Sequence, residues 1–356
     1  MGIGARIWLA HRAPHSTDID YYREILGLAR QGRSVYETTR YNYAPVLLWI
    51  LMALKRMAGA VGAPFEDVLR SFLIVTDLAV AAVLARLAAR LRSVTPGVAA
   101  TMYLTNPVVI WVSAGQAQFD NLIVLFLLIA LLADRPRADD PGPRWTSVGS
   151  LAISIGIKQI TAFHPILWLR GPHWRRALLP WALVAALFVP YARDARAIRD
   201  HVLLYRSVPR SFGFSELVLF DERFSLPLSL TAVAMMASTA WILRKREKCR
   251  SSLLLFLVLL VFAPGFGLQY LVWPLALGAL FGGPGLWLTT AAGMLWTNVG
   301  APWSDLVGVN QFGGQLLWLC LVLWALREAR LTGLFGGGTT LRFALQGGSR
   351  VRLTPR

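Results

Sequence analysis

Residues 17–49 read TDIDYYREILGLARQGRSVYETTRYNYAPVLLW. The segment carries two acids separated by one residue, Asp18 and Asp20, then a run of Tyr and Arg, and long apolar segments make up most of the remaining chain. Hydrophobic residues are 56% of the chain and charged residues only 15%, whereas a soluble protein carries about 25%. Only helices and closed barrels satisfy the backbone in lipid, and barrel-type alternation is absent. The sequence therefore predicts an all-α polytopic membrane protein.

The apolar segments predict a bundle of roughly ten transmembrane helices. The predicted spans are residues 71–91, 97–113, 119–133, 147–167, 177–192, 226–243, 252–264, 268–283, 285–300 and 311–326. Segment 147–167 must break near Lys158 and turn back, because only then do the short Lys/Arg clusters share one side, which the positive-inside rule makes cytoplasmic. Residues 43–54 are apolar but too short to span, which favours an interfacial helix.

This topology divides the chain into three parts. Residues 1–70 form an outer-face region with the acidic motif, 71–330 form the bundle, and 331–356 form a basic, flexible cytoplasmic tail. The outer loop 193–225 is rich in Arg and could either contact phosphate or form its own ion pairs. The net charge of +17 would suggest nucleic acid in a soluble protein, but here it follows the topology. Two cysteines are too few for a metal or disulfide framework.

The acids of the opening segment are the first candidates for chemistry. A carboxylate within hydrogen-bond reach of a hydroxyl can act as its general base. Asp18 and Asp20 share a face if the backbone is extended but lie ~200° apart around a helix. The structural alternative is a capping box, with Thr17 at the N-cap and Asp20 at N3.

Two further polar sites interrupt the apolar part of the chain. In GQAQFDN (115–121), we expect Gln116, Gln118 and Asp120 to line the outer mouth of the bundle and orient sugar hydroxyls, unless Asp120 only caps the next helix. Lys158 lies within an apolar stretch, where a charge is costly and marks a functional site by default. It could neutralise a lipid phosphate, or it could simply extend to the membrane surface.

For three other polar residues, the sequence favours a structural role or leaves the role open. Gln269 follows a helix break at Pro264–Gly267 and should lie near the outer surface, while the neighbouring Tyr270 fits an aromatic belt equally well. His164 favours packing at a helix end over a ligand role. Asp77 has no charge partner nearby in sequence, so we expect hydrogen bonds inside the bundle.

With these residues in view, the chain resembles the GT-C superfamily of membrane glycosyltransferases. Within it, the chain looks most like the family of catalytic subunits of GPI mannosyltransferase I. TDIDYY, GRSVY (32–36) and TTRYNYAPVLLW (38–49) follow that family's opening almost in step. TNPVVIWVSAG (105–115), the Lys158 region and QYLVWPL (269–275) resemble later segments in the same order.

The resemblance implies an inverting transfer of a hexose, expected to be mannose, from a polyprenyl-phosphate donor on the non-cytoplasmic face. It implies an essential acidic pair, with Asp20 favoured as the base because its neighbour Tyr21 matches an Asp-Tyr pair in related enzymes. Asp18 would then bind the acceptor or, with Asp20, a divalent cation such as Mg²⁺ or Mn²⁺. Tyr21 and Tyr43, in the same opening segment, and Gln269 are expected to contact substrate, and Lys158 the leaving phosphate.

The chain departs from that family in two ways. The family has a full transmembrane helix before the acidic loop, and only a short apolar run precedes it here. The Arg/Ala-rich composition suggests a bacterium, so the expected acceptor is a lipid-linked or envelope glycan and the expected location the bacterial plasma membrane. Two other classes stay open: a transporter or flippase of lipid-linked sugars, which would carry an inverted repeat that is not evident, and a non-catalytic subunit of an envelope complex.

Overall fold

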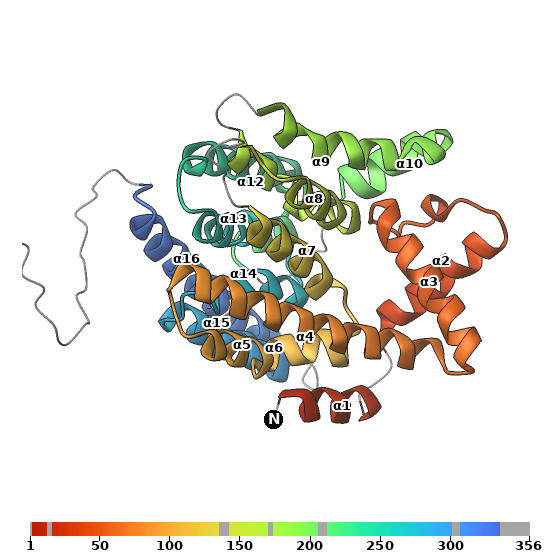
Figure 1. Cartoon of the computed structure of the whole chain (residues 1–356), viewed down its shortest axis with the longest axis horizontal. Helices are drawn as coiled ribbons and strands as arrows, with labels where there is room; N and C mark the ends of the chain where they lie inside the picture. The colour runs from red at the N-terminus through yellow and green to blue at the C-terminus, as the bar shows by residue number, and fades with distance from the viewer. Residues whose placement is uncertain are drawn as a thin grey trace, which may run out of the picture.

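The computed structural model describes residues 2–12, 16–134, 142–169, 174–205, 212–300 and 307–334, except for the side chains of 297–300 and 307–311. These residues are mostly helical, and no strand occurs among them (Figure 1). The first half contains α1 (Gly2–Arg12), α2 (Thr17–Arg30), α3 (Pro45–Val61), α4 (Phe65–Leu91), α5 (Pro96–Leu104), α6 (Pro107–Ile110) with the π-helical turn η2 (Trp111–Gly115), α7 (Asp120–Ala133) and α8 (Trp145–Ile157). The all-helical prediction is confirmed for the part of the chain that the structure describes.

The second half begins with two 3-10 turns, η3 (Gln159–Thr161) and η4 (His164–Trp168). The elements after them are α9 (Trp174–Leu187), η5 (Val189–Asp194), α10 (Ala195–Ile198), η6 (Arg199–Leu203), α11 (Ser215–Phe220), η7 (Glu222–Phe224), α12 (Ser225–Leu243), α13 (Lys248–Phe262), η8 (Leu268–Leu271), α14 (Val272–Gly278), α15 (Pro284–Gly300) and α16 (Val307–Leu331). The predicted loop 193–225 thus contains several short helices, and most of the predicted tail lies outside the described residues.

Fewer helices than predicted are long enough to cross a membrane. Among the residues that the structure describes, three helices qualify by length and composition: Phe65–Leu91, Glu222–Leu243 and Phe312–Leu331. Two bent pairs raise the number to five, α5 with Pro107–Gly115 (54°) and α9 with Val189–Leu203 (64°). The other predicted spans form shorter helices. α7, for example, has 14 residues, about 21 Å of helix against a hydrocarbon core of about 30 Å. Several helices can therefore span a membrane, but a set of ten is not confirmed.

The predicted break at Lys158 is present. α8 ends at Ile157, Lys158 adopts an extended conformation (φ −152°, ψ 132°), and the 3-10 turns η3 and η4 come next. The extended residue interrupts the hydrogen-bond ladder of α8, which turns the chain before the predicted span would be complete.

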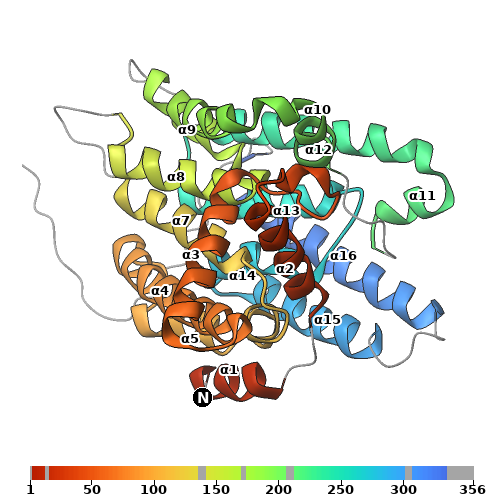
Figure 2. The same ribbon diagram turned by 90° about the vertical axis from the view of Figure 1, so that its right-hand side faces the viewer.

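α2 and α3 lie together at one end of the molecule, and α4, α9 and α16 run lengthwise toward the other (Figure 1). Figure 2 looks onto the first end, with α2 and α3 in front of α14. α14 is buried over its whole length, and α13 is buried on nearly every side. The sequence of α14, and that of α13 from Leu253 onward, is apolar all round, which is the pattern of a central helix. α14 therefore lies in the interior of the molecule, behind α2 and α3 in the view of Figure 2.

Asp77 of α4 holds several helices together. It is fully buried, and its carboxylate accepts hydrogen bonds from Tyr103 Oη (2.7 Å), Ser113 Oγ (2.6 Å) and Asn121 Nδ2 (3.0 Å). The predicted hydrogen bonding inside the bundle is thus observed. Arg6 of α1 adds an ion pair, with Nε 2.7 Å from Asp77 Oδ2. Because Arg6 is distant in sequence, the neighbours of Asp77 could not reveal this partner.

Candidate active site

Lys158 lies in an aromatic cage behind α2 and α3. Its Nζ is 4.7 Å from the ring centroid of Tyr270, 5.4 Å from that of Trp273 and 5.7 Å from that of Tyr43. The same atom is 3.3 Å from Asp120 Oδ1. The ammonium is buried, and its side chain is held by these groups, so it does not extend to the membrane surface. The cage fixes one positive charge at a defined place.

Asp120 is the acid that anchors this cation. Its Oδ1 also accepts a hydrogen bond from Trp273 Nε1 at 2.7 Å, and the side chain is buried. The expected alternative, a helix cap, is not the role seen: α7 begins at Asp120 itself, and its N-cap residue is Phe119. The turn before α7 places Ala117 in the left-handed region at φ +58°, which costs about 1 kcal/mol or more in a residue other than glycine. Such strain is characteristic of functional turns.

Asp18 faces the same cluster from the first turn of α2. Its carboxylate is hydrogen-bonded to the side chain of Gln118, which belongs to that strained turn. Burial raises the pKa of Asp18 above its ordinary value, while the Gln118 bond and the charge of Lys158 oppose the rise and the charge of Asp120 adds to it. The site therefore contains a half-buried carboxylate whose proton affinity is increased, close to a fixed cation.

The start of α2 is attached to the turn by a second contact. The N-cap residue is Ser16, whose hydroxyl makes no capping bond and instead donates to the Gln116 carbonyl at 2.8 Å. The capping box considered for Thr17 and Asp20 is thus not formed. This attachment holds the first turn of α2, and with it Asp18, over residues 116–118.

Asp20 and Tyr21 lie on other faces of α2. Asp20 Oδ1 is 3.3 Å from Arg23 Nη1, and its side chain is 47% exposed. The ring of Tyr21 lies 4.8 Å below the guanidinium of Arg40, which in turn pairs with Glu24. The helical geometry turns Asp20 ~200° from Asp18, so the structure brings Asp18, and not Asp20, to Lys158.

The remaining predicted residues are divided between the cluster and its surroundings. Tyr43 is in the cage, and Gln118 contacts Asp18. Gln116 reaches the cluster through its backbone. Gln269 lies next to the cage in sequence, and its side chain folds over Gly267, where a Cβ would be 2.5 Å from Gln269 Oε1.

Three aromatic residues of the site were not predicted as site residues. Tyr270 and Trp273 stack at 4.8 Å between centroids, because their i, i+3 spacing puts them on one face of the η8–α14 segment. Tyr22 comes four residues after Asp18, so it shares that face of α2; it packs edge-on against Phe119 at 5.4 Å. Burial and then the charges of Asp18 and Asp120 raise the pKa of Tyr22 well above its ordinary value. The i, i+4 spacing from Asp18 was the available signal for Tyr22.

The geometry does not support a cation shared by the acidic pair. Asp18 and Asp20 have different partners on different sides of α2. Within the described ranges, no group of three or more His, Cys, Asp or Glu side chains could hold a metal ion. A divalent cation at this pair therefore stays a prediction from the resemblance.

An apolar groove begins beside the cluster. Its volume is about 470 Å³, and Gln159 and Ala44, the neighbours of Lys158 and Tyr43, are among its lining residues. The rest of its lining is apolar: Ile155, Ala162, Trp181, Val184, Ala185, Phe188, Ala192, Ala195, Ile198, Val202 and Leu203. Gln159 Nε2 donates to the Val202 carbonyl at 2.8 Å, a hydrogen bond that joins two of the lining residues. The groove could hold an extended hydrocarbon chain.

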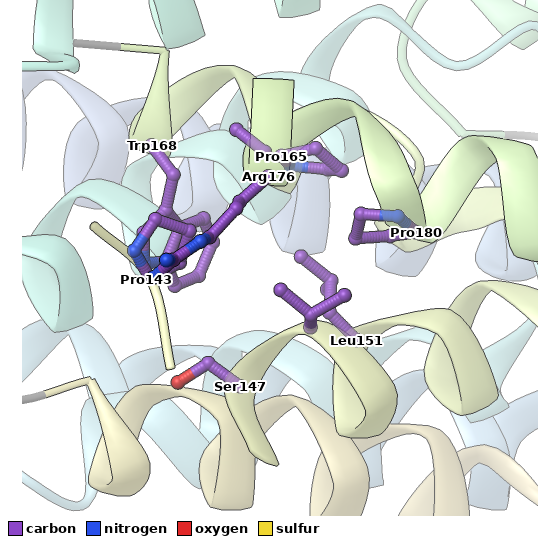
Figure 3. Close-up of a pocket in the computed structure, with 9 residues that line it drawn as sticks. Pro143, Ser147, Leu151, Pro165, Trp168, Arg176 and Pro180 are labelled. Atoms are coloured by element: carbon purple, nitrogen blue, oxygen red, sulfur yellow. The ribbon is translucent and has the colours of Figure 1, made fainter. Parts of the chain in front are cut away.

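A second cavity lies between α8, η4 and α9 (Figure 3). It has a volume of only about 10 Å³, room for about one water molecule. Its lining includes Pro143, Ser147, Leu151, Pro165, Trp168, Arg176 and Pro180. It is too small for a sugar, and we assign it to packing.

An all-helical fold with candidate membrane spans and a buried carboxylate–cation pair is the arrangement expected of a membrane glycosyltransferase. Residues 9–170 match the model of the MptA_B family, described as alpha-(1->6)-mannopyranosyltransferase, N-terminal domain. The match confirms the expected resemblance to GT-C mannosyltransferases and identifies the protein as an enzyme. The matched range contains Asp18, Asp120 and Lys158, whereas Tyr270 and Trp273 lie beyond it.

Proposed function

We propose that the protein transfers mannose from a polyprenyl-phosphate donor to a hydroxyl of a lipid-linked or envelope glycan, with inversion at the anomeric carbon. The observation that carries the proposal is the position of the Asp18 carboxylate in one buried cluster with the caged Lys158 ammonium. An acid that accepts a proton and a cation that stabilises a leaving phosphate are the two functions that this transfer requires.

Asp18 is our candidate for the general base. A base works best when its pKa lies near the working pH, and burial moves the pKa of Asp18 in that direction. Gln118 holds the carboxylate in place. Sequence resemblance favours Asp20, but the pairing of Asp20 with Arg23 on an exposed face favours a supporting role for that residue.

The proposed reaction is a single displacement. Asp18 takes the proton of the acceptor hydroxyl as its oxygen bonds to the anomeric carbon. The bond from that carbon to the phosphate oxygen breaks on the opposite face, and the polyprenyl phosphate leaves with the electron pair. Attack opposite to the leaving group inverts the anomeric carbon. Lys158 stabilises the charge that develops on the phosphate, and the three rings around it keep water away.

The apolar groove supports a lipid-linked donor. It starts at Gln159, next to the proposed phosphate site, and its lining offers a hydrocarbon chain almost only apolar contacts. A sugar nucleotide would gain nothing from such a surface. A polyprenyl chain in the groove would bring its phosphate to Lys158.

The distribution of charge supports an active site on the non-cytoplasmic face of a bacterial plasma membrane. Basic residues gather where α4 ends and α13 begins, at the end of the molecule away from α2 and α3 (Figure 1). Arg90 donates to the Leu131 and Leu132 carbonyls there, both at 2.8 Å. The positive-inside rule makes this end cytoplasmic and the Lys158 end external.

The test is mannosyl transfer from a synthetic polyprenyl-phosphate mannose in membranes that contain the protein. Asp18→Asn should lower the rate by about 10²–10⁴-fold, the usual contribution of a general base. Asp20→Asn is the matched control, on another face of the same helix, and should retain most of the rate. A full rate with Asp18→Asn at unchanged protein level, or a loss confined to Asp20→Asn, would reject Asp18 as the base. The anomeric configuration of the product, read by NMR, tests inversion.

A further inference from the structure

A second groove, distinct from the active site, lies between α2, α3 and the first residue of α4. Its volume is about 450 Å³. The lining residues are Arg23, Leu26, Gly27, Ala29, Arg30, Met52, Lys55, Arg56 and Phe65. The lining of the groove therefore combines apolar side chains with basic ones.

The charges of this groove are unbalanced. Arg23 is neutralised by Glu66, whose Oε1 accepts from Arg23 Nε at 2.7 Å. For Arg30, Lys55 and Arg56, no carboxylate within the described ranges lies at ion-pair distance. Solvated basic residues are common on helix surfaces, but these three converge on one concave surface. A concave surface with three uncompensated cations is complementary to an anion.

The neighbouring surface of α3 indicates where this anion resides. Trp49 is 44% exposed, Met57 46% and Val61 64%. Their spacing places them along one side of α3, as in a helix that lies in a membrane interface. Phe65 lines the groove and is also the first residue of the candidate span Phe65–Leu91. The groove therefore opens at the depth of lipid headgroups.

We propose that this groove binds the phosphate headgroup of an anionic membrane lipid. The phosphate contacts Arg30, Lys55 and Arg56, and the glycerol and upper acyl carbons pack on Leu26, Met52 and Phe65. The site is separate from the catalytic cluster: Arg30 comes twelve residues after Asp18 on α2, which is about 18 Å along the helix. A lipid bound here attaches the α2–α3 pair to the membrane and leaves the donor site open.

The test is binding of short-chain lipids to the whole protein purified in a neutral detergent, measured by native mass spectrometry. The probes are dioctanoyl phosphatidylglycerol, dioctanoyl phosphatidylcholine and inorganic phosphate. The variant Arg30→Gln/Arg56→Gln removes two groove charges. The matched control Arg33→Gln/Arg40→Gln removes two charges nearby that pair with Glu37 and Glu24 and do not line the groove.

We expect phosphatidylglycerol to bind the unaltered protein, and its dissociation constant to rise by about tenfold or more in the groove variant but not in the control. Phosphatidylcholine and inorganic phosphate should bind at least tenfold more weakly than phosphatidylglycerol. An equal loss in the control would show diffuse attraction in place of a site. Equal binding of phosphatidylcholine, or of inorganic phosphate, would also overturn the proposal, since the first needs no net anion and the second no lipid.

Discussion

Lys158 and Asp120 form a buried ion pair. The contribution of this pair to stability can be separated experimentally from the contribution of Lys158 to the transfer rate. The perturbation is a double-mutant cycle of Lys158→Met, Asp120→Asn and the two together. Lys158→Met removes the cation and leaves the buried Asp120 carboxylate with the Trp273 N–H and its own backbone N–H as partners. Asp120→Asn leaves the ammonium among its aromatic rings, and the new amide oxygen can still accept from Trp273.

The separation of 3.3 Å between Nζ and Oδ1 gives an attraction of about 5 kcal/mol at an effective dielectric constant of about 20. Removing one partner of a buried pair costs about 3–5 kcal/mol, in agreement with that figure. We therefore expect Lys158→Met to lower the melting temperature by about 4–7 °C. Asp120→Asn should lower the free energy of unfolding by less, because the Lys158 ammonium keeps its ring contacts. Each of these contacts stabilises the cation by about 0.5–2 kcal/mol. The double variant should be close to Asp120→Asn alone.

The assay combines thermal unfolding in detergent, at one scan rate, with the mannosyl transfer rate. Lys158→Met and the double variant should both lose about 10²–10³-fold in rate, because neither has the cation for the phosphate. A control pair lies at the other end of the molecule, where Lys248 pairs with Asp134 and is 4.9 Å from the Trp168 ring. Lys248→Met should lower stability and leave the rate nearly intact.

Two results would refute this reasoning. If the double variant regained activity along with stability, Lys158 would have only a structural role. If the stability losses added within about 0.5 kcal/mol, the two side chains would not interact as the geometry requires.

Two further substitutions test the acid and the apolar groove of the same site. Asp18→Asn should raise the melting temperature while it removes activity, because burial raises the pKa of Asp18 and the charged carboxylate is therefore unfavourable in the folded protein. For the same reason, the stability of the unaltered protein should fall as the pH rises from the ordinary value of 3.8 through the raised pKa, and the transfer rate should rise over that window; a stability that increases there would contradict the assignment. Ala185→Trp should fill the apolar groove and raise the KM for a long polyprenyl donor but not for a short-chain analogue. Equal effects on both donors would place the hydrocarbon chain elsewhere.

The sequence was sufficient for the class of fold and for most of the groups in the cluster. Apolar length and charge placement predicted a helical membrane protein, and the cost of a charge in an apolar segment singled out Lys158. The number of spans was overestimated, because an apolar run does not show where a helix bends or ends, as at Lys158 itself. Which of Asp18 and Asp20 faces the site depends on whether residues 17–21 are helical or extended. The spacing of the two acids is compatible with both conformations.

The cage around Lys158 could not be predicted for a different reason. Its rings come from positions far apart in the chain, and Tyr270 and Trp273 fit an aromatic belt equally well. Only the contacts of these two rings with Lys158, and of Trp273 with Asp120, show that they face a cation. The partner of Asp77, Arg6, was missed because a contact between distant residues leaves no local signal.

The cage also bears on how the enzyme is made. Two of its three rings belong to the η8–α14 segment, beyond the matched N-terminal domain that supplies the acid and the cation. During synthesis the ribosome delivers Asp18, Asp120 and Lys158 long before Trp273. Until that segment enters the bundle, the Lys158 ammonium lacks two of the three aromatic rings around it, and Asp120 lacks the hydrogen bond from the Trp273 indole. In a nascent chain the catalytic groups are therefore present before the site is complete. The enzyme becomes active only late in biogenesis, after the η8–α14 segment has packed into the bundle.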